Sequence, residues 1–118
     1  MQSKILREMQ RSIVTRFLDT IILGELRRSG PLSGYDVMDF VQVKFGFLVS
    51  PGTVYALLYS MERKGLLKGA CAQTKRTYAL TDKGTETIDT ILESKDEIQM
   101  FMKTVLTADQ ALSKLQSL

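Results

Sequence analysis

The stretch SPGTVYALLYSMERKG, residues 50–65, decides how this chain folds. Ser50 offers a hydroxyl that can cap a helix, and Pro51 follows at the first helical position, where a missing N–H has no cost. Apolar side chains then recur at i, i+3, i+4 and i+7, at Val54, Leu57, Leu58 and Met61. Gly65 suits the position just after a helix. The stretch therefore predicts a helix over about 51–64 with one buried face.

The outward face of this helix carries small and hydroxyl-bearing side chains. They are Thr53, Tyr55, Ala56 and Tyr59, flanked by Arg63 and Lys64. Such a face allows close approach to the base edges in a DNA major groove. Ser50 and the backbone N–H groups around Gly52 form a helix N-terminus that can hold a phosphate. The alternative is that these are surface residues of a three-helix core without a ligand.

A second helix is predicted just before the first, over about 33–44. Ser33 can cap it by accepting a hydrogen bond from the N–H of Asp36, whose carboxylate also suits the positive end of the helix dipole. Gly46 marks its end. Two such helices joined by a short turn form a helix-turn-helix, in which the second helix is the recognition helix.

Farther upstream, the sequence predicts one long first helix over about 4–28, with apolar residues at helical spacing. Gly30 and Pro31 end it, because glycine accepts the left-handed position after a helix and proline blocks continuation. Downstream of Gly65, two short segments at about 66–72 and 76–80 predict a β-hairpin. Its tip is polar and basic. A hairpin here reads as a wing whose Lys68, Lys75 and Arg76 contact the DNA backbone, or else as a solvated basic turn.

The last helix is expected to begin after Thr81, which caps it, and no Pro or Gly follows Gly84. It extends as far as Leu118, or is followed by a separate turn capped at Thr107. Its apolar side chains exceed what one small domain needs to cover; those assigned to dimerisation are Ile88, Ile91, Leu92, Ile98, Phe101, Met102 and Val105. We expect a homodimer with two-fold symmetry, although a helix that folds back on its own core stays an alternative.

The predicted fold is mainly α with a small β-hairpin. It consists of a winged helix-turn-helix domain over 1–80 and a long C-terminal dimerisation helix over 81–118. Two recognition helices in a dimer would lie about one DNA turn apart and match a near-palindromic operator. Charge agrees with a DNA partner, because residues 1–80 carry 12 Lys and Arg against 6 Asp and Glu, whereas residues 81–118 carry 4 against 7.

Composition narrows the classes of function. The chain has no His and one Cys, so Cys/His metal sites, an intrachain disulfide and His-based catalysis are excluded, and we expect no cofactor, no metal and no enzyme activity. Cys71 is expected to fill a small apolar gap. Apolar stretches are too short for a membrane span, and the first residues do not form a signal peptide, so a soluble cytoplasmic protein is expected.

Five stretches in this order resemble the PadR-like transcriptional regulators. They are ILGEL at 22–26, GPLSGYDV at 30–37, SPGTVYALL at 50–58, MERKGLL at 61–67 and RTYALTDKG at 76–84. The resemblance implies a dimeric winged-helix repressor that contacts double-stranded DNA through its second and third helices and its wing. Carried over by position, these contacts fall on Ser33, Tyr35, Ser50, Gly52, Thr53, Tyr55, Tyr59, Lys75, Arg76 and Tyr78.

Three departures from the family pattern bear on function. The wing is shorter and less basic than usual. The chain has no Trp, which argues against the sandwiching of flat aromatic drugs between tryptophans that some small relatives use. The C-terminal helical part is short, so a classical inducer site is not expected and the effector stays unknown. An alternative function, a winged-helix adaptor that binds protein and not DNA, would show an acidic or apolar recognition face.

Overall fold

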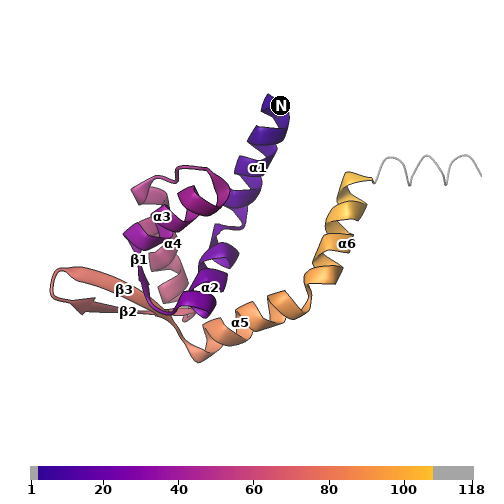
Figure 1. Ribbon diagram of the computed structural model, residues 1–118. Coiled ribbons are helices and arrows are strands. Elements are labelled where there is room, and N and C mark those ends of the chain that lie inside the picture. The colour runs from indigo at the N-terminus through magenta and orange to yellow at the C-terminus, as the bar shows by residue number, and fades with distance from the viewer. Residues whose placement is uncertain (1–2, 108–118) are drawn as a thin grey trace, which may run out of the picture. The chain divides into compact units, whose positions relative to one another are not determined.

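The structure, a computed structural model, describes residues 3–107. Within this range lie six helices and a three-stranded antiparallel sheet (Figure 1). The elements are α1 Lys4–Arg16, α2 Leu18–Ser29, β1 Leu32–Ser33, α3 Gly34–Phe45, α4 Pro51–Arg63, β2 Leu67–Ala72, β3 Lys75–Leu80, α5 Asp82–Glu93 and α6 Lys95–Leu106. The chain divides into two compact units, one ending at Ile88 and the other beginning at Asp89.

The predicted helix-turn-helix is confirmed as α3 and α4. Ser33 Oγ accepts from the N–H of Asp36 at 3.1 Å, and the Asp36 carboxylate accepts from the N–H of Ser33 at 2.9 Å, so the cap is reciprocal. Ser50 Oγ accepts from the N–H of Thr53 at 3.2 Å, with Pro51 at the first helical position. Gly46 ends α3 in the left-handed region, at φ 75°. Gly65 likewise follows the end of α4 in the left-handed region, at φ 80°. Local capping chemistry therefore sets all four helix ends.

The core of the first unit is built from one face of each helix. The predicted inner face of α4 is buried at Val54, Leu58 and Met61, while Leu57 is only half-buried. These side chains pack among the buried residues of the other elements, which include Leu18, Ile22, Leu23, Leu26, Val37, Val41 and Phe47. Burial of this apolar surface leaves the opposite face of α4 exposed on the unit.

The wing consists of β2 and β3, which pair antiparallel from Leu67 with Leu80 to Ala72 with Lys75. The hairpin projects beyond the helices of its unit (Figure 1). A short strand that the sequence did not predict, β1, pairs Leu32 with Tyr78 on the other side of β3. The central strand is therefore β3, and the sheet joins the wing to the start of α3.

Two predicted helices are each interrupted once. The first breaks at Phe17, with φ −103° and ψ 18°, and the last breaks at Ser94, with φ −98° and ψ 12°. Both break residues keep a helical hydrogen bond, since Phe17 N–H donates to Ile13 O and Ile98 N–H donates to Ser94 O, each at 2.9 Å. The predicted single helices over 4–28 and from 81 onward are thus wrong in continuity, and any helix or cap beyond Thr107 lies outside the described residues.

Two predicted environments are also corrected. Cys71 is exposed on β2 and does not fill an apolar gap. It lies on the same strand face as buried Leu67, but it pairs with Arg76 near the turn of the hairpin, where the core no longer covers this face. Ile88 is buried in the first unit, where its Cδ1 lies 4.0 Å from the place a Cβ on Gly24 would occupy. It belongs to the core and not to a free dimerisation face. No helix among residues 3–107 combines the length and apolarity needed to cross a bilayer.

Candidate nucleic-acid interface

Most of the predicted contact residues lie exposed on the first unit. Tyr55 and Tyr59 on α4 are 48% and 61% exposed. The other exposed members of the predicted set are Tyr35, Ser50, Gly52, Thr53, Lys64, Lys75 and Arg76. They come from the start of α3, the whole length of α4 and the wing. Most of the side chains predicted from the sequence to contact DNA are therefore exposed on the folded unit.

The N-terminus of α4 is suited to an anion. Its first turn holds no acidic residue, so no carboxylate neutralises the positive end of the helix dipole. Ser50 Oγ and Thr53 Oγ1 lie 2.8 Å apart, and nothing stands within 4 Å of the place a Cβ on Gly52 would occupy. A phosphate can therefore approach the backbone at Gly52 and the Ser50 hydroxyl group at once.

Tyr55 is held by a glycine on the neighbouring helix. A Cβ at Gly34 would lie only 2.4 Å from Tyr55 Cε1 and 2.9 Å from its hydroxyl oxygen. Gly34 is buried at the start of α3, so the tyrosine ring rests across the backbone of that helix. Packing against the backbone of Gly34 therefore positions the exposed edge of the Tyr55 ring.

Two predicted contact residues, Ser33 and Tyr78, are buried. Ser33 is 4% exposed because its hydroxyl caps α3, and Tyr78 is 6% exposed because it lies on the central strand between β1 and β2. Burial removes both side chains from the surface. We leave them out of the interface and assign them to the junction of sheet and helix.

Two of the three wing cations named from the sequence, Lys75 and Arg76, have an acidic partner on the helix-turn-helix. Lys75 Nζ lies 3.9 Å from Asp36 Oδ2, and Arg76 Nη2 lies 2.9 Å from Glu62 Oε2. The backbone N–H of Ser33 lowers the pKa of Asp36, with a smaller contribution from Lys75. The Arg76 hydrogen bond lowers the pKa of Glu62. Sequence reasoning missed Glu62, although it is the only carboxylate between residues 50 and 65.

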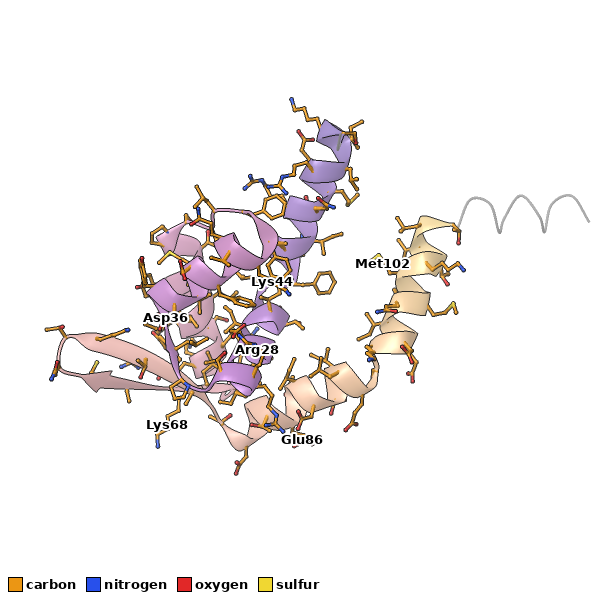
Figure 2. All side chains as sticks on the ribbon, in the orientation of Figure 1. Arg28, Asp36, Lys44, Lys68, Glu86 and Met102 are labelled. Carbon is orange, nitrogen blue, oxygen red and sulfur yellow. The ribbon has the colours of Figure 1, made fainter. Side chains whose placement is uncertain are left out.

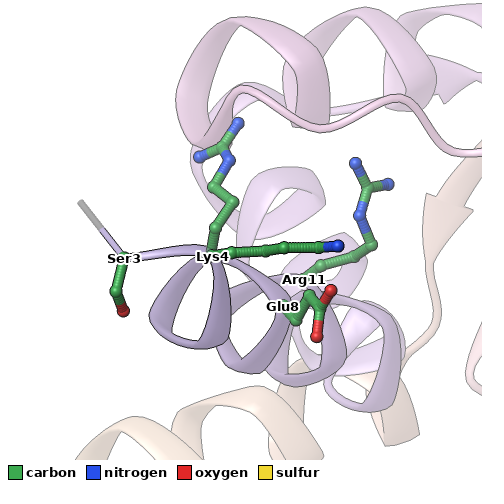
Figure 3. Close-up of a pocket in the computed structure, with 5 residues that line it drawn as sticks. Ser3, Lys4, Glu8 and Arg11 are labelled. Atoms are coloured by element: carbon green, nitrogen blue, oxygen red, sulfur yellow. The ribbon is translucent and has the colours of Figure 1, made fainter. Parts of the chain in front are cut away.

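A further cluster that the sequence analysis missed ties α1 to the turn of the helix-turn-helix. Arg7 donates to Gly46 O at 2.8 Å, and its guanidinium lies 4.0 Å from the centre of the Phe47 ring. Arg11 stacks on the same ring at 4.9 Å. A pocket beside this contact is lined by Ser3, Lys4, Arg7, Glu8 and Arg11 (Figure 3). The cluster steadies the segment that leads into α4.

Each unit also exposes an apolar row. On α6, Ile98, Phe101, Met102 and Val105 recur at helical spacing, and no described residue of this helix is buried. Leu92 on α5 is exposed and Ile91 half-buried. A row that was not assigned from the sequence is exposed on α1 at Ile5, Leu6, Met9 and Ile13, and it continues to Phe17 just after the helix. Both rows are apolar surface that the unit carrying them leaves exposed.

Among residues 3–107, no three or more side chains of His, Cys, Asp or Glu lie close enough together to hold a metal ion. The functional features are instead a helix-turn-helix, an exposed recognition helix and a hairpin beside it, with Lys68 pointing away from the helices (Figure 2). Together they define a winged helix-turn-helix protein.

Comparison with known proteins agrees with this class. The model of the transcriptional regulator PadR-like family matches residues 22–90. The chain therefore belongs to the PadR-like family of transcriptional regulators, whose members act on transcription through DNA binding. No match emerges among curated protein sequences.

Solved structures show the same fold. A PadR family transcription regulator from Clostridium difficile R20291 has 25% identity and a TM-score of 0.65, over 76% of this chain and 98% of that one. F93 from STIV, a winged-helix DNA-binding protein, has 25% identity and a TM-score of 0.63, over 70% and 91%. A transcriptional regulator from Clostridium thermocellum has 19% identity and a TM-score of 0.69, over 79% and 96%.

Proposed function

We propose that this protein is a transcriptional repressor that binds a near-palindromic operator as a homodimer. One observation carries the proposal: the outward face of α4 presents Thr53, Tyr55 and Tyr59 to solvent. Glu62, the one carboxylate of α4, is paired with Arg76 at 2.9 Å, so its negative charge is already compensated. A ligand that approaches α4 thus meets hydroxyl groups, aromatic edges and the positive end of a helix dipole.

Contacts are assigned by chemistry. Tyr55, Tyr59 and Thr53 face the base edges, because their hydroxyl groups donate and accept hydrogen bonds. Ser50, the Gly52 backbone, Tyr35 and the amines of Lys64 and Lys75 face phosphates and fix the position of the protein along the duplex.

Dimerisation is supported by the exposed apolar rows. Phe101 on α6 is 70% exposed, and large aromatic side chains seldom stay in water when a partner can cover them. A second copy supplies identical rows, and a two-fold dimer is the commonest assembly for soluble proteins. Occupation of an operator by such a dimer would exclude other proteins from the promoter, which is the proposed mode of repression.

Binding-site selection from fragmented genomic DNA tests the proposal. Recovered fragments should share a near-palindromic sequence, and gel-shift titration should show binding to it roughly 10³-fold or more tighter than to random DNA. Equal retardation of every fragment contradicts operator recognition. Retardation of none, with capture of a protein instead, supports the adaptor alternative.

A further inference from the structure

We propose that Glu62 is a positioning residue that ties the wing to the recognition helix and withholds Arg76 from the DNA backbone. The inference rests on the proposed DNA-binding function and deepens it. It reverses the role expected for Arg76 from the sequence, which was a phosphate contact.

Glu62 touches both strands of the wing from the last turn of α4. Its Oε1 and Oε2 accept from Arg76 Nη2 on β3, at 3.1 Å and 2.9 Å. Its Oε2 also accepts from the backbone N–H of Gly69 on β2, at 3.1 Å. One carboxylate therefore holds two adjacent strands, so a rotation of the wing away from α4 breaks these hydrogen bonds together.

The wing is shaped to receive the guanidinium of Arg76. A Cβ at Gly69 would lie 2.3 Å from Arg76 Nη2 and 2.7 Å from its Cζ, so any residue larger than glycine would push the guanidinium out of this position. Arg76 is paired across the ladder with Cys71, whose Sγ lies 3.7 Å from Nη1. The Tyr78 ring lies 5.5 Å from the guanidinium carbon. Gly69, a poor strand residue, is explained by this close approach.

These contacts change the charge that the wing offers to DNA. A phosphate that binds Arg76 must first displace a carboxylate that already neutralises it. Lys75 is less engaged, since its amine lies 3.9 Å from Asp36 and its side chain is 60% exposed. Lys68 is exposed and points away from the helices (Figure 2). Lys68 and Lys75 therefore supply the wing's attraction to DNA of any sequence. The side chains of α4 discriminate between sequences.

The test variant is Glu62→Gln, which keeps the size of the side chain and one acceptor oxygen but removes the charge. Its matched control is Asp39→Asn, which removes the same charge at an exposed position of α3. Binding to operator and to random DNA is measured between 50 and 200 mM salt. Glu62→Gln should steepen the salt slope by about 0.9, so that affinity falls about threefold more than in the wild type across this range. In Glu62→Gln, the ratio of the affinity for operator DNA to the affinity for random DNA should also fall. Asp39→Asn should change the salt slope and this ratio less.

Arg76→Ala completes the cycle. In the wild-type background it should leave the salt slope unchanged, and in the Glu62→Gln background it should abolish the added slope. A slope flattened by about 0.9 in the wild-type background would overturn the inference, since Arg76 would then already contact a phosphate. Equal effects of Glu62→Gln and Asp39→Asn would overturn it as well.

A measurement made without DNA distinguishes a failure of this inference from a failure of the proposed function. In Glu62→Ala, hydrogen exchange at the Gly69 amide should accelerate at least tenfold, because its acceptor is gone. Unchanged exchange there overturns the tie between helix and wing. Failure of the wild type to retard any DNA overturns the proposed function instead, whatever the Gly69 amide shows.

Discussion

The ring of Tyr55 rests on the backbone of Gly34, so close that a methyl group on Gly34 would meet Tyr55 Cε1 at 2.4 Å. The contact joins the first residue of α3 to the outward face of α4. It couples the position of a proposed base-reading side chain to the packing angle between the two helices of the motif.

Gly34→Ala should therefore displace the Tyr55 ring and weaken operator binding. The loss should be about tenfold, the lower end of what one good contact to a base contributes. The added methyl group faces a half-exposed ring that can rotate, so the melting temperature should change little. In gel-shift titration, the double variant Gly34→Ala with Tyr55→Ala should bind no more weakly than Tyr55→Ala alone. Additive losses would show that Gly34 acts by another route.

Gly84→Ala should instead damage the fold. A Cβ at Gly84 would lie 2.1 Å from Leu66 O, a backbone atom that cannot rotate away. The free energy of unfolding in urea should fall by about 1–3 kcal/mol. Gly24→Ala is the matched control, because its nearest neighbour would be Ile88 Cδ1 at an ordinary 4.0 Å and alanine favours a helix. A Gly84→Ala variant as stable as the control would refute the close approach.

Lys75→Ala should lower affinity for operator and random DNA by similar factors. One lost phosphate contact flattens the salt slope by about 0.9 and leaves the preferred sequence unchanged. Lys95→Ala, an exposed lysine on α6, serves as the control. A change in base preference on removal of Lys75 would contradict the assignment of the wing to the DNA backbone.

Acid should destabilise the first unit partly through Asp36. Its pKa is lowered in the folded protein, chiefly by the N–H of Ser33, so the folded state favours the ionised form. The resulting stabilisation is complete above the unfolded pKa of about 4 and is lost as pH falls through the lowered folded value. Urea unfolding at several pH values should show a smaller drop in stability below pH ~4 for Asp36→Asn than for the wild type. Equal drops would show that Asp36 contributes nothing to this dependence.

Phe101→Glu should dissociate the proposed dimer, because it places a charge on the exposed apolar row of α6. Light scattering at micromolar concentration should show a dimer for the wild type and a monomer for the variant. Lys103→Glu, on the opposite side of the same helix, should stay dimeric. A wild type that is already monomeric would contradict the use proposed for this row.

The helix-turn-helix follows from local sequence signals alone. Ser33 with Asp36, and Ser50 with Pro51, act within one turn of chain, and the spacing of Val54, Leu58 and Met61 assigns a buried face without knowledge of any distant residue. The family resemblance rested on these same stretches, and the match over residues 22–90 bears it out.

Other features depend on contacts between residues far apart in sequence, and these could not be predicted from local patterns. The addition of β1 beside β3 buried Tyr78, and the packing of α5 placed Ile88 in the core. The helices break at Phe17 and Ser94, and neither residue is a Pro or Gly that would predict a break from the sequence. The pairing of Cys71 with Arg76 set the guanidinium over Gly69 and within reach of Glu62. Strand register and packing arise from long-range contacts, and these decide whether a predicted surface charge is free or already paired.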